Sequence, residues 1–282
     1  MKRKIVIFIF AFMPLVLGAQ KNSFDKVVGK TAVNLEPGSF RFAIGAEIHN
    51  DKWGYGDYSS TAIPLDLSLG LTDNLEIDLG SRYNKAHAFV DGVAMNDKHS
   101  YHDMYAGVRI LMNPHTMFEK PAYGFWLGLY FPVHGYETWK PSAQFLWSSA
   151  INDEFSWNFN LGLSYYLGKQ EYPLGLQEKV HPGAEVSMNV EVGYKITEAF
   201  KLCSGLDMEE HFLGDRYFQG GGSQEIEEFS SWTLVSALRL KPVDLPLVLD
   251  AGIRVGLNAG ARDSISFFIQ FQIIPAGSDA VW

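Results

Sequence analysis

Apolar and polar side chains alternate at every second residue through most of the chain, and this pattern constrains the fold more than any other feature. The clearest segment places Phe155, Trp157, Phe159, Leu161, Leu163 and Tyr165 against Ser156, Asn158, Asn160, Gly162, Ser164 and Tyr166. Successive side chains of a β-strand point to opposite faces, so such a segment forms a strand with one apolar and one polar face. We find no amphipathic helix longer than a couple of turns. The sequence therefore predicts an all-β protein.

The alternating segments are long, about 9 to 13 residues, which is the length that a tilted strand needs to cross a bilayer. There are about twelve of them, and we expect a transmembrane antiparallel up-and-down β-barrel of about 12 strands. The predicted strands are 38–49, 62–72, 75–84, 101–112, 122–133, 142–150, 155–168, 183–196, 200–212, 229–241, 247–257 and 264–274.

The connections mostly alternate between long and short. Long ones are 50–61, 85–100, 169–182 and 213–228, and short ones are 73–74, 152–154, 197–199 and 242–246. In bacterial barrels short turns face the periplasm and long loops face the exterior, and an even strand number leaves both termini periplasmic. The pattern predicts that topology.

The N-terminus has the features of a secretory signal peptide. Met1, Lys2, Arg3 and Lys4 precede an apolar run from Ile5 to Leu17, which ends in Gly18, Ala19 and Gln20. We expect cleavage after Ala19. The alternative, an uncleaved anchor, requires about 20 apolar residues. The expected organisation is a signal peptide (1–19), a periplasmic N-terminal segment (20–37), the barrel (38–275) and a C-terminal tail (276–282), in the outer membrane of a Gram-negative bacterium.

Composition excludes several classes of protein. Cys203 is the only cysteine, so there is no disulfide framework. Loss of Lys2, Arg3 and Lys4 with the signal peptide takes the net charge from −9 to −12, which excludes nucleic acid as a partner. The expected partners are outer-membrane lipid and lipopolysaccharide, a small-molecule solute and the barrel-assembly machinery, and we expect a monomer.

A secreted β-sandwich or a soluble barrel is the alternative fold, because its strands also alternate. Uniformly long strands argue against it, as do aromatic residues near strand ends that can form interfacial girdles. These residues are Tyr83, Trp126, Tyr136, Trp139, Trp147, Trp157, Tyr165, Tyr194 and Trp232.

The polar faces of the predicted strands carry charges of both signs. In a water-filled lumen they set ion selectivity, whereas in a narrow barrel they pair across strands and form a plug; both readings stay open for about twelve strands. Among the fifteen charged residues assigned to these faces, nine are acids and six are bases. The excess of three negative charges predicts a modest preference of the channel for cations. The predicted lumen residues are Asp66, Glu76, Asp78, Arg82, Asp103, Arg109, Glu185, Glu191, Lys195, Lys201, Asp207, Glu209, Arg239, Asp250 and Arg254.

No cofactor, metal site or catalytic residue is predicted, and we expect no enzyme. Seven of the eight histidines fall in exterior loops or strand ends, but no ligand geometry follows from such scattered positions. Nucleophile elbows, metalloprotease helices and phosphate-binding loops are missing. Asp207, Glu209 and His211 share one strand face, which leaves a rim-active hydrolase as an alternative. Cys203 on the same face is expected to be a lumen side chain.

Leu67 to Tyr83, which reads LSLGLTDNLEIDLGSRY, resembles the outer-membrane barrels of the "meta-pathway of phenol degradation" family. Asp103 to Arg109 (DMYAGVR) and Gly128 to Gly135 (GLYFPVHG) are similar to the same family. The resemblance implies a barrel that passes small compounds, aromatic or apolar ones included. The chain departs from the usual barrel ending after Ile274 and Pro275, so that either Phe271 or Trp282 provides the terminal aromatic residue.

These observations predict a porin-like channel or transporter for passive passage of small solutes. The alternative from a different class is a structural or adhesive outer-membrane barrel with a closed lumen.

Overall fold

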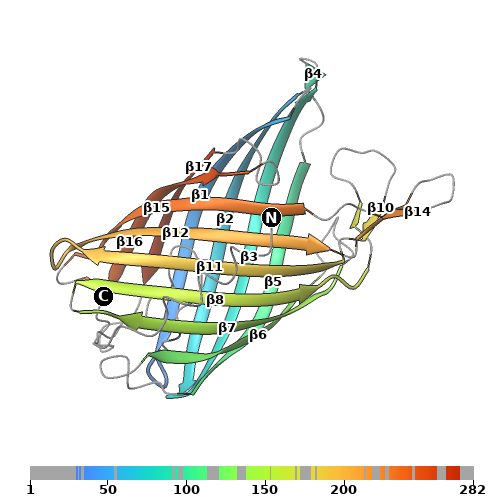
Figure 1. Ribbon diagram of the computed structural model, residues 1–282. Helices are drawn as coiled ribbons and strands as arrows, with labels where there is room; N and C mark the ends of the chain where they lie inside the picture. Colours follow the sequence, from blue (N-terminus) through green and yellow to red (C-terminus); the bar gives the residue numbers. More distant parts are fainter. Residues whose placement is uncertain are drawn as a thin grey trace, which may run out of the picture.

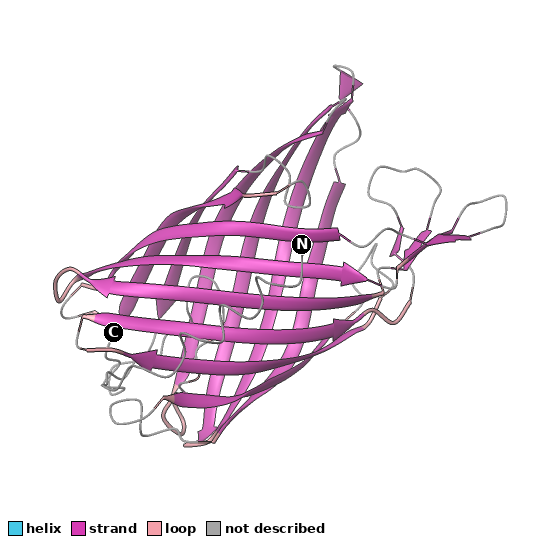
Figure 2. Ribbon diagram, in the orientation of Figure 1, coloured by secondary structure: helices cyan, strands magenta, loops and turns pink. Residues whose placement is uncertain are grey.

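A computed structural model describes residues 30, 32, 35–53, 56–90, 93–94, 98–112, 121–131, 138–152, 154–168, 170–171, 179–181, 183–212, 214–217, 223–225, 229–242, 245–258 and 265–273. Every regular element in these ranges is a β-strand (Figure 2). No helix of the described chain is long and apolar enough to span a bilayer. The expected signal peptide, its cleavage site and the C-terminal tail lie outside the described residues.

Twelve long strands form one closed antiparallel barrel (Figure 1). Each pairs with its neighbours in sequence, and the first strand pairs with the last from Phe42 opposite Ile273 to Asn50 opposite Ile265, which closes the ring. The twelve strands are β1 (Phe40–Trp53), β2 (Gly56–Thr72), β3 (Leu75–Val90), β5 (Lys98–Leu111), β6 (Ala122–Tyr130), β7 (Lys140–Ala150), β8 (Phe155–Tyr165), β11 (Ala184–Lys195), β12 (Phe200–Phe212), β15 (Phe229–Leu240), β16 (Leu247–Gly256) and β17 (Ile265–Ile273). The predicted fold class is confirmed.

The two ends of the barrel differ in their connections. At one, here called the turn end, β1 begins, β17 ends and several turns are short. Their sequences explain them: Asn152 Oδ1 accepts from the backbone N–H groups of Glu154 and Phe155 at 2.9 and 2.7 Å, and Thr197 Oγ1 accepts from those of Ala199 and Phe200. Such side-chain acceptors stabilise tight turns. The opposite end is the loop end.

The strands extend beyond their predicted bounds mainly at the loop end. Predicted loops 50–61 and 85–100 are largely taken up by β1, β2, β3 and β5, which continue to Trp53, from Gly56, to Val90 and from Lys98. A short strand, β4 (Val93–Ala94), pairs with the end of β3. The other long connections contain a separate four-stranded sheet, seen beside the barrel in Figure 1. Its strands are β9 (Gln170–Glu171), β10 (Lys179–His181), β13 (Asp215–Tyr217) and β14 (Ser223–Glu225).

The outer face of the barrel is apolar. On β8, for example, Leu161 and Leu163 are 43% and 56% exposed, whereas Asn160 and Ser164 are buried on the inner face. The arrangement is the reverse of a soluble protein, since large aliphatic side chains cover the outside and polar ones the inside. The outer face of the barrel is therefore suited to contact with the hydrocarbon chains of lipids.

Aromatic residues form two belts on this face. One lies near the turn end, where the tilted rings of Trp147 and Trp157, and those of Phe155 and Tyr194, are in contact, and the other lies near the loop end, with Trp139, Tyr165 and Trp232. On β8 the eleven residues from Phe155 to Tyr165 span about 33 Å along the strand, or about 25 Å along the membrane normal at a tilt of about 40°, which matches the usual apolar band. Trp126 does not belong to a belt, because it faces inward; Tyr136 lies outside the described residues.

Candidate functional site in the barrel lumen

The inner wall collects the predicted lumen residues. Fourteen of the fifteen occupy inward positions, which are the buried or half-buried ones of each alternating strand: Asp66, Glu76, Asp78, Arg82, Arg109, Glu185, Glu191, Lys195, Lys201, Asp207, Glu209, Arg239, Asp250 and Arg254. Asp103 is the exception. It lies where the register of β5 against β3 shifts, so that Gly80 faces Tyr105 but Arg82 faces His102. Alternation cannot assign a face to Asp103, whose side chain is not among those described.

A first charged network occupies the wall of β1, β2, β3 and β5 near the turn end. The Arg41 Nη2 donates to Glu76 Oε1 at 3.2 Å and to Ser68 Oγ at 2.6 Å, and Arg109 Nη2 lies 3.2 Å from Asp78 Oδ2. Ser68 Oγ in turn donates to Asp78 Oδ1 at 2.6 Å. The two carboxylates and two guanidinium groups thus compensate each other across four strands, as buried ions require.

A second network lies on β15, β16 and β17. Arg239 grips Asp250 with two hydrogen bonds, Nε to Oδ1 at 2.6 Å and Nη2 to Oδ2 at 2.8 Å, and Gln272 Nε2 donates to the same carboxylate at 2.9 Å. Lys201, directly opposite Arg239 in the register, donates from Nζ to Ser156 Oγ at 2.7 Å. The two parallel hydrogen bonds between the Arg239 guanidinium and the Asp250 carboxylate are the strong, bidentate form of carboxylate pairing.

The most deeply buried charges of this half of the lumen are balanced in sign. Eight charged side chains of the wall are at most 3% exposed, four of each sign: Arg41, Arg109, Lys201 and Arg239 with Glu76, Asp78, Glu191 and Asp250. Six of these eight form ion pairs across strands, Arg41 with Glu76, Arg109 with Asp78, and Arg239 with Asp250.

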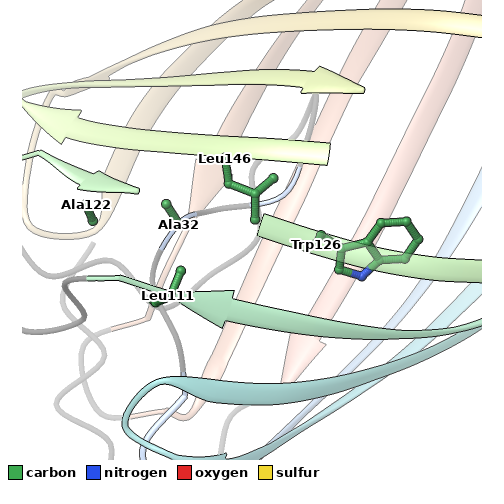
Figure 3. Packing of buried hydrophobic residues seen from close by; sticks show 5 residues of the cluster. All are labelled: Ala32, Leu111, Ala122, Trp126 and Leu146. Atoms are coloured by element: carbon green, nitrogen blue, oxygen red, sulfur yellow. The ribbon is translucent and has the colours of Figure 1, made fainter. Parts of the chain in front are cut away.

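Residues of the N-terminal segment also occupy the turn-end half of the lumen. Residues 20–37 are predicted to form a periplasmic N-terminal segment; of those that the structure describes, Lys30, Ala32 and Leu35 contact inner-wall side chains at the turn end, whereas Glu36 and Pro37 are exposed. The backbone N–H of Leu35 donates to Glu76 Oε2 at 2.9 Å, and that of Ala32 to Ser148 Oγ at 2.9 Å. Figure 3 shows Ala32 between Leu111 and Leu146. Buried N–H groups need such acceptors, and the polar wall supplies them.

The loop-end half of the lumen is more open. Arg82 and Arg254, 36% and 28% exposed, both approach Glu47, at 2.9 and 3.4 Å. Across the wall, Asp207 bonds Asn189, and Glu209, 44% exposed, lies 3.8 Å from His211 Nε2. Lys140 Nζ lies 3.6 Å from Glu185 Oε2. Solvent therefore reaches several of these charges.

In this half the described inward charges leave a negative excess. Asp66, Glu47, Glu185, Asp207 and Glu209 are five acids, against the three bases Arg82, Lys140 and Arg254. Arg41, Glu47 and Lys140 are inward charges that were not among the predicted lumen residues. The first two alternate with Phe40, Phe42, Ile44 and Ile48, so the phase of β1 would have revealed them. Lys140 lies just before the predicted start of its strand.

Aromatic side chains line one side of the lumen. Tyr105, Trp126 and Tyr130 lie within 5.3 to 6.1 Å of one another, centroid to centroid, and all face inward from β5 and β6. Lys140 Nζ lies 4.5 Å from the ring centroid of Tyr130 and 5.1 Å from that of Tyr166. The Trp126 indole lies over Gly107 and Gly128, where any Cβ would come within 2.6 Å of its ring. Two glycines thus provide the room for it.

The remaining candidates form no recognisable reactive site. Cys203 is buried in a small cluster with Val235 and Ala237. Within the described ranges, no three side chains of the His, Cys, Asp and Glu types are grouped so that they could hold a metal ion.

Comparison with known proteins places the fold among outer-membrane barrels. No protein-family model matches the sequence, and no curated protein matches it at a significant level. A solved structure, the COG4313 outer membrane channel from Pseudomonas putida F1, superposes with a TM-score of 0.71 over 89% of this chain and 100% of that one, at 11% identity.

Two further barrels are similar in fold. The transport unit of the autotransporter AIDA-I from Escherichia coli gives a TM-score of 0.57 at 10% identity, over 83% of this chain and 90% of that one. The NanC porin gives 0.53 at 8% identity, over 82% and 98%. At such identities the likeness concerns the fold alone, and this chain has the closed barrel fold that these outer-membrane proteins share.

Proposed function

We propose that the protein is an outer-membrane channel through which small solutes pass passively. The observation that carries the proposal is the opposite polarity of the two faces of the barrel: aliphatic and aromatic side chains outside, charged ones inside. Only helices and closed barrels satisfy every backbone hydrogen bond in hydrocarbon, and a polar interior gives solutes a hydrated route. Similarity in fold to a channel and a porin supports the same function.

Location is tested by membrane fractionation combined with gel mobility before and after heating. We expect the protein in the outer-membrane fraction, with a mobility that changes on boiling because the closed barrel resists detergent. Recovery as a soluble periplasmic protein would contradict the proposal.

Passage is tested by conductance in planar bilayers. The loop-end half exposes Arg82, Arg254 and Glu209 to solvent. The turn-end half then sets the resistance, because its charges are buried and the N-terminal segment lies there. We expect a small, ohmic unit conductance.

Aromatic or apolar compounds are the solute class that we propose. The inward cluster of Tyr105, Trp126 and Tyr130, continued by Tyr166 near Lys140, supports it, since successive rings offer stacking surfaces along one wall. The family resemblance supports the same class. In liposome-swelling assays phenol should enter faster than an aliphatic alcohol of equal size, and equal rates would contradict the preference.

A specific observation favours one alternative, a barrel with a closed lumen and a structural role. The eight buried, balanced charges and the N-terminal segment fill the turn-end half much as a plug would. Absence of conductance across many insertions of correctly folded protein would favour this alternative.

A further inference from the structure

One side chain of the N-terminal segment, Lys30, lies among groups that suit an organic cation. Its Nζ is 5.0 Å from the ring centroids of both Tyr105 and Trp126, 3.7 Å from Asp78 Oδ2, and 3.4 Å from the hydroxyl of Tyr105. Two ring systems, a carboxylate and a phenol oxygen therefore surround one ammonium group. We call Tyr105, Trp126 and Asp78 the amine cage.

The barrel wall holds the members of this cage in place without Lys30. Tyr105 donates its hydroxyl hydrogen to Asp66 Oδ1 at 2.6 Å, which leaves the oxygen lone pairs free to accept from an ammonium. Asp78 is fixed by Ser68 and Arg109. Trp126 lies against Gly107 and Gly128. The cage is thus built by β2, β3, β5 and β6, whereas its occupant comes from outside the barrel strands.

Aromatic faces attract ammonium groups through their quadrupole, and the attraction is strongest for indole and where water is excluded. The carboxylate of Asp78 adds a charge-assisted hydrogen bond. We propose that the amine cage is a binding site for small alkylammonium solutes, and that Lys30 is a tethered competitor which occupies it when no solute is bound. The inference goes beyond the proposed function, because it concerns binding and holds whether or not the solute crosses the membrane.

The test uses n-butylammonium, which reproduces the lysine side chain from Cβ to Nζ. Binding to the full-length protein in detergent micelles is measured by ligand-observed NMR, for wild type and for Lys30→Ala. Because the tethered ammonium competes at a high effective concentration, we expect the apparent Kd of Lys30→Ala to be lower than that of wild type by about tenfold. Lys30→Gln, which removes the charge but keeps most of the chain length, should give a smaller gain in the same direction.

Matched controls separate binding from a merely structural role of Lys30. Lys241→Ala removes a lysine directly after β15, a strand that borders neither β5 nor β6, so it should leave the Kd unchanged. In the Lys30→Ala background, Tyr105→Phe should keep most of the affinity and Tyr105→Leu should lose about fivefold of it. n-Butanol, the neutral analogue, should not bind.

The inference is overturned if wild type and both Lys30 variants bind n-butylammonium equally, or if n-butanol binds as well as the amine. Lys30 is then only an anchor of the N-terminal segment. This outcome is distinct from failure of the proposed function, because absence of bilayer conductance leaves the NMR measurement unaffected. Heat-modifiable mobility verifies that each variant is folded.

Discussion

At the level of single residues, the Trp126 indole occupies space that Gly107 and Gly128 leave free. A Cβ at Gly128 would lie 2.0 Å from the ring, so Gly128→Ala must displace it. We expect Gly128→Ala to lower the free energy of unfolding by about 1–3 kcal/mol, the usual cost of overpacking. Urea unfolding followed by gel mobility measures it. Gly162→Ala is the control, because there the Cβ meets the rotatable hydroxyl of Ser187, and an equal loss in both variants would contradict the explanation.

The pair of Arg239 and Asp250 allows a second prediction at the same scale. Both side chains are at most 2% exposed, so Asp250→Asn leaves a buried guanidinium without its counter-charge. Loss of one partner of a buried pair costs about 3–5 kcal/mol. The double variant Arg239→Met with Asp250→Leu should recover most of this loss in the same urea assay. If the double variant is as unstable as the single one, the charge is not the cause.

Most inward residues could be predicted one by one from strand phase, and the exceptions have physical causes. Trp126 was expected in an outer belt, although Tyr123, Phe125 and Leu127 already define the outer face of β6; only its aromatic character suggested otherwise. Asp103 lies at a shift in register, which no alternation pattern reveals. The burial of Lys30 depends on contacts with four distant strands, and a segment without periodicity gives no sign of them.

At the level of elements, alternation located all twelve strands because each one has a face in contact with lipid. It underestimated β1, β2, β3 and β5 at the loop end. Beyond the bilayer both strand faces meet water, so hydrophobic periodicity ends while the backbone ladder continues. Loop lengths inferred from polarity alone are therefore too long, and the small sheet of β9, β10, β13 and β14 was not predicted for the same reason.

The depth of a strand residue in the bilayer leads to a prediction for β8. Leu161 lies at mid-strand and Leu167 two residues past the strand end, with similar exposures of 43% and 49%. We expect Leu161→Arg to cost about 2–4 kcal/mol of folding stability in liposomes and Leu167→Arg about 0–1 kcal/mol. Equal costs at the two positions would show that this face does not contact hydrocarbon.

For the whole molecule, the distribution of charge along the lumen determines ion selectivity. The most deeply buried charges of the turn-end half are balanced, Lys195 there is ion-paired with Glu198 and Lys30 with Asp78, and the described inward residues of the loop-end half carry two more acids than bases. In a narrow lumen such an excess is poorly screened, so a modest cation preference is expected from reversal potentials in a KCl gradient. Asp207→Asn with Glu209→Gln should reduce it, and Arg82→Gln with Arg254→Gln should increase it. Anion preference in the wild type would contradict this account.

Pairing of β1 with β17 also has a consequence for biogenesis. β1 is synthesised before the other barrel strands, but its second neighbour, β17, is synthesised after them. The two strands pair over nine residue pairs, from Phe42 to Asn50 on β1. Until β17 is available, two strand edges lack partners, which hydrocarbon does not tolerate. A ribosome product truncated before Ile265 should therefore not insert as a smaller barrel. It should remain dependent on chaperones and be degraded, so that insertion is all-or-none for the complete polypeptide.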